Sequence, residues 1–154
     1  NKLELFKAVV RNSLVAGFDE FSGKPLSARD RLVHLLTAFM ERVAGSHLSG
    51  IPKLIIAEAG NFPELARFYY ENVISRGRAL VGHALKRGME SGEFRPMDVE
   101  TTIDVVIAPI LMLLIWRYSM NCCQGSESDP RLYLKIHMDL LRHGLRRPEK
   151  ESQV

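Results

Sequence analysis

The sequence has little of several features that would place a protein outside the ordinary globular class. Aromatic residues make up 8% of its 154 residues, and its two cysteines, Cys122 and Cys123, are adjacent, so they cannot staple distant segments. The longest apolar run, from Val105 to Trp116, is shorter than the ~20 residues that a membrane-spanning helix needs. The sequence does not open with the pattern of a secretion signal, in which basic residues are followed by an apolar stretch. We therefore expect a cytoplasmic protein without a disulfide framework or a membrane partner.

An excess of one charge is missing as well. The chain has 21 Lys and Arg residues against 18 Asp and Glu residues, and the basic residues are spread out apart from a small cluster between Arg142 and Arg147. Such a distribution is no footprint of nucleic-acid binding by itself. With 46% apolar residues, the chain is large enough for one hydrophobic core. We predict one domain over residues 1–147, followed by a disordered tail at 148–154.

Helical periodicity is the main pattern that the sequence does contain. Helix caps are predicted at Ser27, Asp98 and Asp129, and Pro52 and Pro130 fit first helical turns. The expected helices span about 1–17, 27–44, 52–60 and 63–92, then from 98 past Trp116 to a polar loop that begins at Gln124, and 129–146. Because no segment alternates as a strand would, we predict an all-α fold of about six helices.

Two of these helices carry more apolar residues than one core needs. The fifth is apolar almost all round from Val105 to Trp116, so protein must cover it on every side. Pro109 in its middle is expected to kink it and to leave room beside it. The last helix has two overlapping apolar faces, formed by Tyr133, Ile136 and Leu140 and by Leu134, Met138, Leu141 and Leu145. One face can pack on the core and the other on a partner.

The sequence shows none of the usual constellations of catalysis. No nucleophile with a base, no paired carboxylates and no phosphate loop stand out, so we expect neither an enzyme nor a cofactor. The histidines are scattered, which disfavours a metal site, at His34, His47, His83, His137 and His143. Cys122 and Cys123 are read as inert free thiols, with metalloid binding or oxidant sensing as the less favoured alternative.

One long segment carries a resemblance to a known family. Residues 55–96, IIAEAGNFPELARFYYENVISRGRALVGHALKRGMESGEFRP, resemble the regulatory domain of bacterial TetR-type (tetracycline-repressor) transcriptional regulators. The opening NKLELFKAVV is similar to the family's segment just after the DNA-recognition helix, and there Lys2 matches a phosphate contact. Since the sequence begins with Asn rather than Met, we expect a chain entered within a fold, without its helix-turn-helix head. Residues 1–17 would begin the helix that joins this head to the rest of the domain. Only the head would bind operator DNA.

The resemblance implies an effector-binding and dimerisation domain, whose last two helices form a four-helix bundle with a second subunit. The expected residues of this homodimer interface are Ile107, Leu111, Leu114, Tyr118, Leu134, Met138, Leu141 and Leu145. The expected ligand site, taken from helix faces, comprises His34, Phe39, Tyr69, Val73, Arg76, Val105, Pro109, Met112 and Trp116. A hydrophobic or aromatic effector should bind there, with its polar end on Arg76 or His34.

The resulting hypothesis is a ligand-responsive repressor. An effector bound beside Pro109 would favour one orientation of the long helices and change the spacing of the two DNA-binding heads. The alternative is a helical dimerisation module without an effector, which a solid interior would favour. A cofactor-free enzyme or a membrane-surface protein comes last, because no reactive constellation or strongly basic amphipathic helix supports it.

Overall fold

The computed structural model describes residues 2–12, 26–44, 50–120 and 129–148. Its elements, in chain order, are α1 (Lys2–Val10), α2 (Ala28–Ala44), α3 (Ile51–Glu58), α4 (Pro63–Tyr69), the π-helical segment η4 (Tyr70–Ile74), α5 (Ser75–Glu90), α6 (Val99–Ser119) and α7 (Pro130–Leu145). α4, η4 and α5 follow without interruption and form one long helix over residues 63–90, as the sequence predicts. Counted in this way, the described ranges contain six helices and no strand, which confirms the all-α prediction.

Some expectations concern residues outside these ranges. They are the end of the first helix near Gly17, the adjacent Cys122 and Cys123, and the tail after Pro148. The side chain of Lys2, expected near a DNA phosphate, is not described either.

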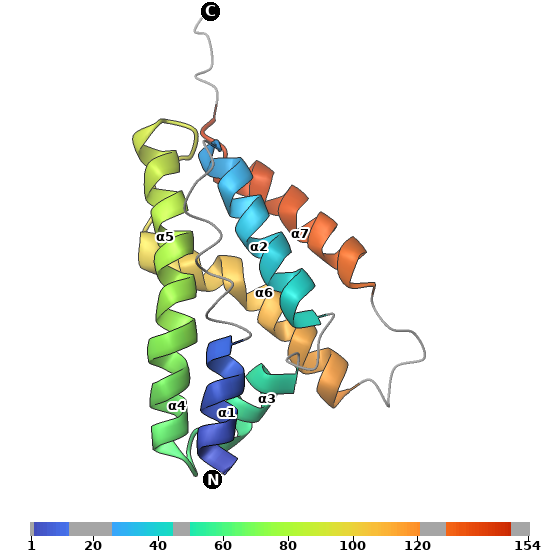
Figure 1. Cartoon of the computed structure of the whole chain (residues 1–154). Helices are drawn as coiled ribbons and strands as arrows, with labels where there is room; N and C mark the ends of the chain where they lie inside the picture. Colours follow the sequence, from blue (N-terminus) through green and yellow to red (C-terminus); the bar gives the residue numbers. More distant parts are fainter. Residues whose placement is uncertain (1, 13–25, 45–49, 121–128, 149–154) are drawn as a thin grey trace, which may run out of the picture.

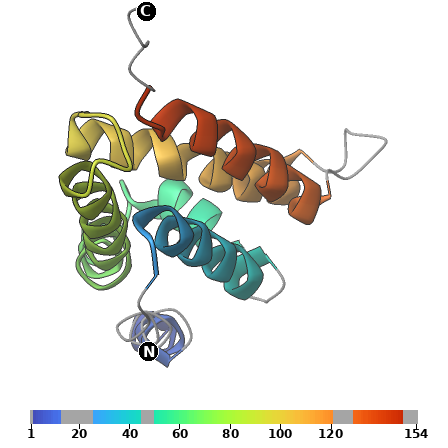
Figure 2. The same ribbon diagram turned by 90° about the horizontal axis from the view of Figure 1, so that it is seen from above.

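The helices are arranged around α6, which crosses the molecule behind α2 (Figure 1). The long helix runs along one edge, while α7 lies beside both α2 and α6. Seen from above, α6 and α7 form one side of the molecule, and α1 lies at the opposite side (Figure 2). There α1 contacts α4. The end of the long helix that meets α1 is thus remote from the outer surface of α7.

Three helices begin where the sequence predicts a cap. Ser27 Oγ accepts a hydrogen bond from the backbone N–H of Asp30 at 3.0 Å. Asp98 and Asp129 use carboxylate oxygens in the same way, accepting from the N–H groups of Thr101 at 2.9 Å and Arg131 at 3.0 Å. Each bond satisfies a donor that the first helical turn leaves without an intrahelical partner. These contacts confirm the starts of α2, α6 and α7.

A loop distant in sequence provides a second cap for α2. The Glu93 carboxylate, just after α5, accepts from the backbone N–H groups of Ala28 and Arg29, both at 3.1 Å. A negative charge at the N-terminus of a helix also interacts favourably with the helix dipole. Glu93 therefore joins the start of α2 to the end of α5.

The next residue, Phe94, closes the same end of the molecule. It is buried, and its ring lies directly over Gly88, where a Cβ would clash with Phe94 Cδ2. Gly92 between them has φ of +77°, a conformation that favours glycine. Phe94 also forms an isolated antiparallel bridge with Arg146, so the loop holds the C-terminal end of α7 as well.

α6 is the apolar helix that the sequence singles out. Its core side consists of Ile103, Val106, Ile110, Leu113 and Leu114, all buried. By length and composition alone α6 could cross a membrane, a test that core helices of soluble proteins also pass, and 28% of its most apolar window is buried. Val105, Met112 and Trp116 on another side of α6 stay exposed among the described residues of this chain.

Two polar side chains of α7 attach it to the backbone of α6. Tyr133 Oη donates to the carbonyl oxygen of Pro109 at 2.9 Å, and buried His137 Nε2 lies 2.9 Å from the carbonyl oxygen of Val106. Because a carbonyl oxygen can only accept, Nε2 carries the proton in this contact. Both bonds fix α7 beside the Pro109 turn, where proline removes one helical donor.

Candidate ligand-binding cavity

A cavity of about 410 Å³ lies between α2, α3, the long helix and α6. This volume is within the range of ~300–1,000 Å³ that small-molecule sites occupy. Most lining residues are apolar, and four have polar side chains, at Arg42, Tyr69, Arg78 and Asp104. The described lining consists of Leu35, Leu36, Phe39, Arg42, Val43, Pro52, Ile55, Ile56, Tyr69, Val73, Ile74, Gly77, Arg78, Leu80, Val81, Asp104, Ile107, Ala108, Ile110 and Leu111.

The π-helical segment η4 shapes the wall that the long helix contributes. π-turns widen a helix by one residue per hydrogen-bonded ring and often occur at functional sites. Here Tyr69 precedes the segment, and Val73 and Ile74 within it line the cavity. Backbone carbonyls near it gain side-chain donors, since Asn72 Nδ2 donates to Phe68 O at 2.9 Å and Ser75 Oγ to Glu71 O at 2.8 Å. The altered helix is thus supported where it meets the cavity.

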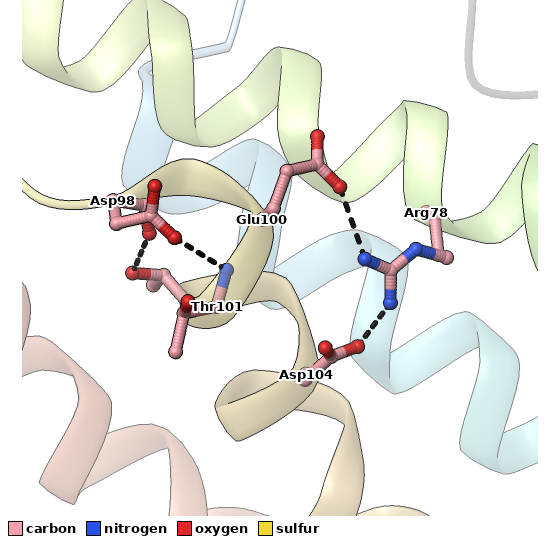
Figure 3. A network of polar contacts seen from close by, with 6 residues as sticks. Arg78, Asp98, Glu100, Thr101 and Asp104 are labelled. Atoms are coloured by element: carbon pink, nitrogen blue, oxygen red, sulfur yellow. Dashed lines mark hydrogen bonds and ion pairs between the residues drawn. The ribbon is translucent and has the colours of Figure 1, made fainter.

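An ion-pair cluster joins α5 to α6 at the edge of the cavity (Figure 3). The Arg78 guanidinium lies between two carboxylates of α6, bonding Asp104 through Nη1 and Glu100 through Nη2, the latter at 3.0 Å. The hydrogen bonds to Asp104 and then Glu100 raise the pKa of Arg78, so its charge is held. Both carboxylates are more than half exposed, which limits the strength of these pairs. The cluster therefore positions α5 on α6 and adds no net positive charge to the cavity.

Tyr69 is the buried polar residue of the lining. It is 6% exposed, and its hydroxyl forms no hydrogen bond with any residue that the structure describes. Burial raises the pKa of Tyr69 to about 12, because the phenolate would lose its hydration. The hydroxyl stays protonated near neutral pH and can donate a hydrogen bond to a molecule in the cavity.

The expected ligand residues are divided between the cavity and other surfaces. Phe39, Tyr69 and Val73 belong to the lining. His34 and Arg76 lie on exposed parts of α2 and α5, outside the described lining. Val105, Met112 and Trp116 are 62%, 54% and 42% exposed on α6, and the carbonyl of Pro109 faces Tyr133 instead. The sequence did not predict Arg78 and Asp104, because an ion pair between two helices has no local sequence signal.

The expected interface residues are also distributed over different environments. Ile107 and Leu111 line the cavity. Leu114, Met138 and Leu145 are buried within the core, and Leu134 and Leu141 pack partly buried against it. Tyr118 is exposed, and its carbonyl oxygen accepts from Lys53 Nζ at 2.7 Å.

A different set of side chains gives α6 and α7 an apolar outer surface. We call it the open face, and its members are Val105, Met112 and Trp116 of α6 and Leu132, Ile136 and Leu140 of α7, all more than 40% exposed. The three α7 members also line the hollow between α2 and α7 that is described below. The two helices are neighbours in the fold. Exposed apolar surface of this kind is typical of an interaction site.

A second hollow lies between α2 and α7 and is broader and more polar than the cavity. Its lining mixes apolar residues such as Met40 and Leu134 with charged ones such as Glu41, Arg131 and Asp139. In the described part of the chain, no group of three or more His, Cys, Asp or Glu side chains could hold a metal ion. The cavity is therefore the best-formed candidate for a small molecule.

Comparison with known proteins gives one family match. The family described as "Tetracyclin repressor-like, C-terminal domain" matches residues 26–120, more than half of the chain. This range includes α2 to α6 and with them all of the described cavity lining. No curated protein and no solved structure matches the sequence.

Proposed function

Because the chain belongs to the tetracycline-repressor-like C-terminal domain family, we propose that it is the effector-sensing and dimerisation part of a cytoplasmic transcriptional repressor. The observation that carries this proposal is the largely apolar cavity of about 410 Å³ between α2, α3, the long helix and α6. A hydrophobic or aromatic effector would gain free energy there by removing apolar surface from water.

The contacts of α1 suggest how binding would affect a DNA-binding head that precedes it. Lys7 Nζ lies 3.0 Å from Glu64 Oε1 of α4, and Arg11 lies over the ring of Phe68 at 5.1 Å. Phe68 is followed by Tyr69, which lines the cavity. A shift of α4 caused by the effector would therefore move α1 with it. The effector must bind one arrangement better than the other, because equal affinity for both would leave operator binding unchanged.

The open face supports the dimerisation part of the proposal. Six apolar side chains that are more than 40% exposed would become covered if α6 and α7 packed against their copies across a two-fold axis. Such a four-helix arrangement is a common way to cover two amphipathic helices. The cavity lies on another side of α6, so one helix would serve both functions.

A pair of variants on α6 tests the cavity as the effector site. Leu111→Trp adds volume to the lining of the cavity, and Met112→Trp introduces the same bulky residue one position later, on the open face. We expect Leu111→Trp to weaken binding of the neutral fluorescent probe N-phenyl-1-naphthylamine at least ~10-fold, and Met112→Trp to leave it nearly unchanged. Fluorescence titration gives both affinities, and circular dichroism checks folding. Equal binding by Leu111→Trp and the unmodified chain would contradict the proposal.

A further inference from the structure

The polar side chains of the cavity differ in whether the fold already engages them. Arg78 bonds to Asp104 and Glu100, which accounts for two of the four polar lining residues. Arg42, the third, also takes part in an interaction within the chain. Among the four polar side chains of the described lining, Tyr69 is the one with no polar interaction within the described residues.

A hydroxyl in this position has a cost unless something binds it. Tyr69 is 6% exposed, and a buried hydroxyl without a hydrogen bond is unfavourable because it has lost its hydration. Its oxygen keeps some accessible surface, and the space that the side chain lines is the cavity. Water can satisfy the hydroxyl while the cavity is empty of ligand. A ligand that displaces this water must replace its hydrogen bond, or affinity is lost.

The charges near the cavity oppose an ionic ligand. The positive charges of Arg42 and Arg78 are matched in number by the negative charges of Asp104 and Glu100. A carboxylate ligand would meet no net positive charge and would lose its own hydration. A neutral molecule avoids this loss.

We propose that the effector is a neutral, largely apolar molecule with one hydrogen-bond acceptor, such as an aryl ketone, and that Tyr69 Oη donates to this acceptor. This inference rests on the proposed function. Tyr69 is then the specificity-determining residue of the site. It distinguishes a ketone from a hydrocarbon of the same shape, because the hydrocarbon leaves the hydroxyl unpaired.

A matched pair of compounds and a matched pair of variants test this assignment. Benzophenone and diphenylmethane differ in one carbonyl group, and each is used to displace N-phenyl-1-naphthylamine from the chain. Tyr69→Phe removes the buried hydroxyl, whereas Tyr70→Phe removes the same group from an adjacent residue that is 55% exposed and outside the described lining. We expect Tyr69→Phe to weaken benzophenone binding ~3- to 10-fold, the range of one hydrogen bond, without weakening diphenylmethane binding. Tyr70→Phe should change neither affinity.

The outcomes separate this inference from the proposed function. Equal affinity for the two compounds in the unmodified chain and in Tyr69→Phe would overturn the role of Tyr69, while the cavity would remain a binding site. At least ~10-fold tighter binding of the anionic 4-benzoylbenzoate than of benzophenone would overturn the neutral ligand and point to the arginines. If neither benzophenone nor diphenylmethane bound, both the inference and the proposed effector site would be contradicted.

Discussion

The cavity and the open face are both apolar surfaces of α6, yet they differ in what covers them. Ile107 and Leu111 on one side face α2, α3 and the long helix, and together these elements enclose the cavity. Met112 and Trp116 on another side stay exposed among the residues that the structure describes. An apolar helix surface therefore does not by itself specify its partner. Whether it faces a ligand or another subunit depends on where the rest of the chain runs.

The largest expected effect comes from the core between these surfaces. Leu114 is 1% exposed, so Leu114→Ala should lower the free energy of unfolding by ~2–5 kcal/mol through lost burial and a new cavity. Met112→Ala is the control on the open face, where loss of an exposed side chain should affect the isolated subunit far less. Urea denaturation at several protein concentrations measures both. If Leu114→Ala weakened only self-association, Leu114 would belong to the interface.

A smaller effect is expected when the open face is made polar. Ile136→Asp places a charge among side chains that a second subunit would cover, and should weaken the dimer at least ~100-fold. Analytical ultracentrifugation measures the dissociation constant. Leu54→Asp is the control, since Leu54 is similarly exposed but lies on α3. A monomeric unmodified chain, or a dimer insensitive to Ile136→Asp, would remove the distinction between the open face and ordinary surface.

The smallest expected effect is at the start of α6, which supports both surfaces. The side chain and the backbone N–H of Thr101 lower the pKa of Asp98. Figure 3 shows the hydrogen bond from this backbone N–H to the Asp98 carboxylate. The ionised cap therefore stabilises the fold above the pKa of Asp98 in the unfolded chain, and this contribution is lost as the pH falls through the lower pKa of the folded state. Asp98→Ala should reduce the melting temperature modestly at neutral pH, with a deficit that shrinks in acid.

Asp98→Ser separates the charge from the cap, because serine also accepts the Thr101 hydrogen bond but does not titrate in acid. Its melting temperature should depend less on pH than that of the unmodified chain. Thermal unfolding followed by circular dichroism between neutral pH and ~pH 2 covers the carboxyl range. A deficit of Asp98→Ala that is the same at every pH would exclude the ionised cap as its cause.

Local signals in the sequence predicted the fold well. Caps at Ser27, Asp98 and Asp129 mark helix starts because each acts on the turn that follows it. The long helix follows from its spacing and from the glycine and proline that end it. The cap that Glu93 provides for α2 spans 65 residues of sequence and therefore has no local pattern.

The assignment of helix faces was the part that periodicity did not specify. In an amphipathic helix the polar stripe indicates which side is outward, but α6 has apolar residues on all sides and no such reference. We predicted Val105, Met112 and Trp116 for the ligand and Ile107 and Leu111 for the interface, and the structure places the first three on the open face and the last two in the cavity. Phe39, Tyr69 and Val73 were predicted from helices that have a polar side, and these three line the cavity.

The contact of Glu93 with the start of α2 also has a mechanical consequence. It holds the start of α2 against the end of α5, beside the contact of Phe94 with Gly88, so this end acts as a hinge between the two helices. The cavity is lined by the other half of α2 and by the first half of α5, toward the end where α1 meets α4. A molecule that spreads these two walls would therefore produce its largest displacement beside α1, and its smallest at the hinge.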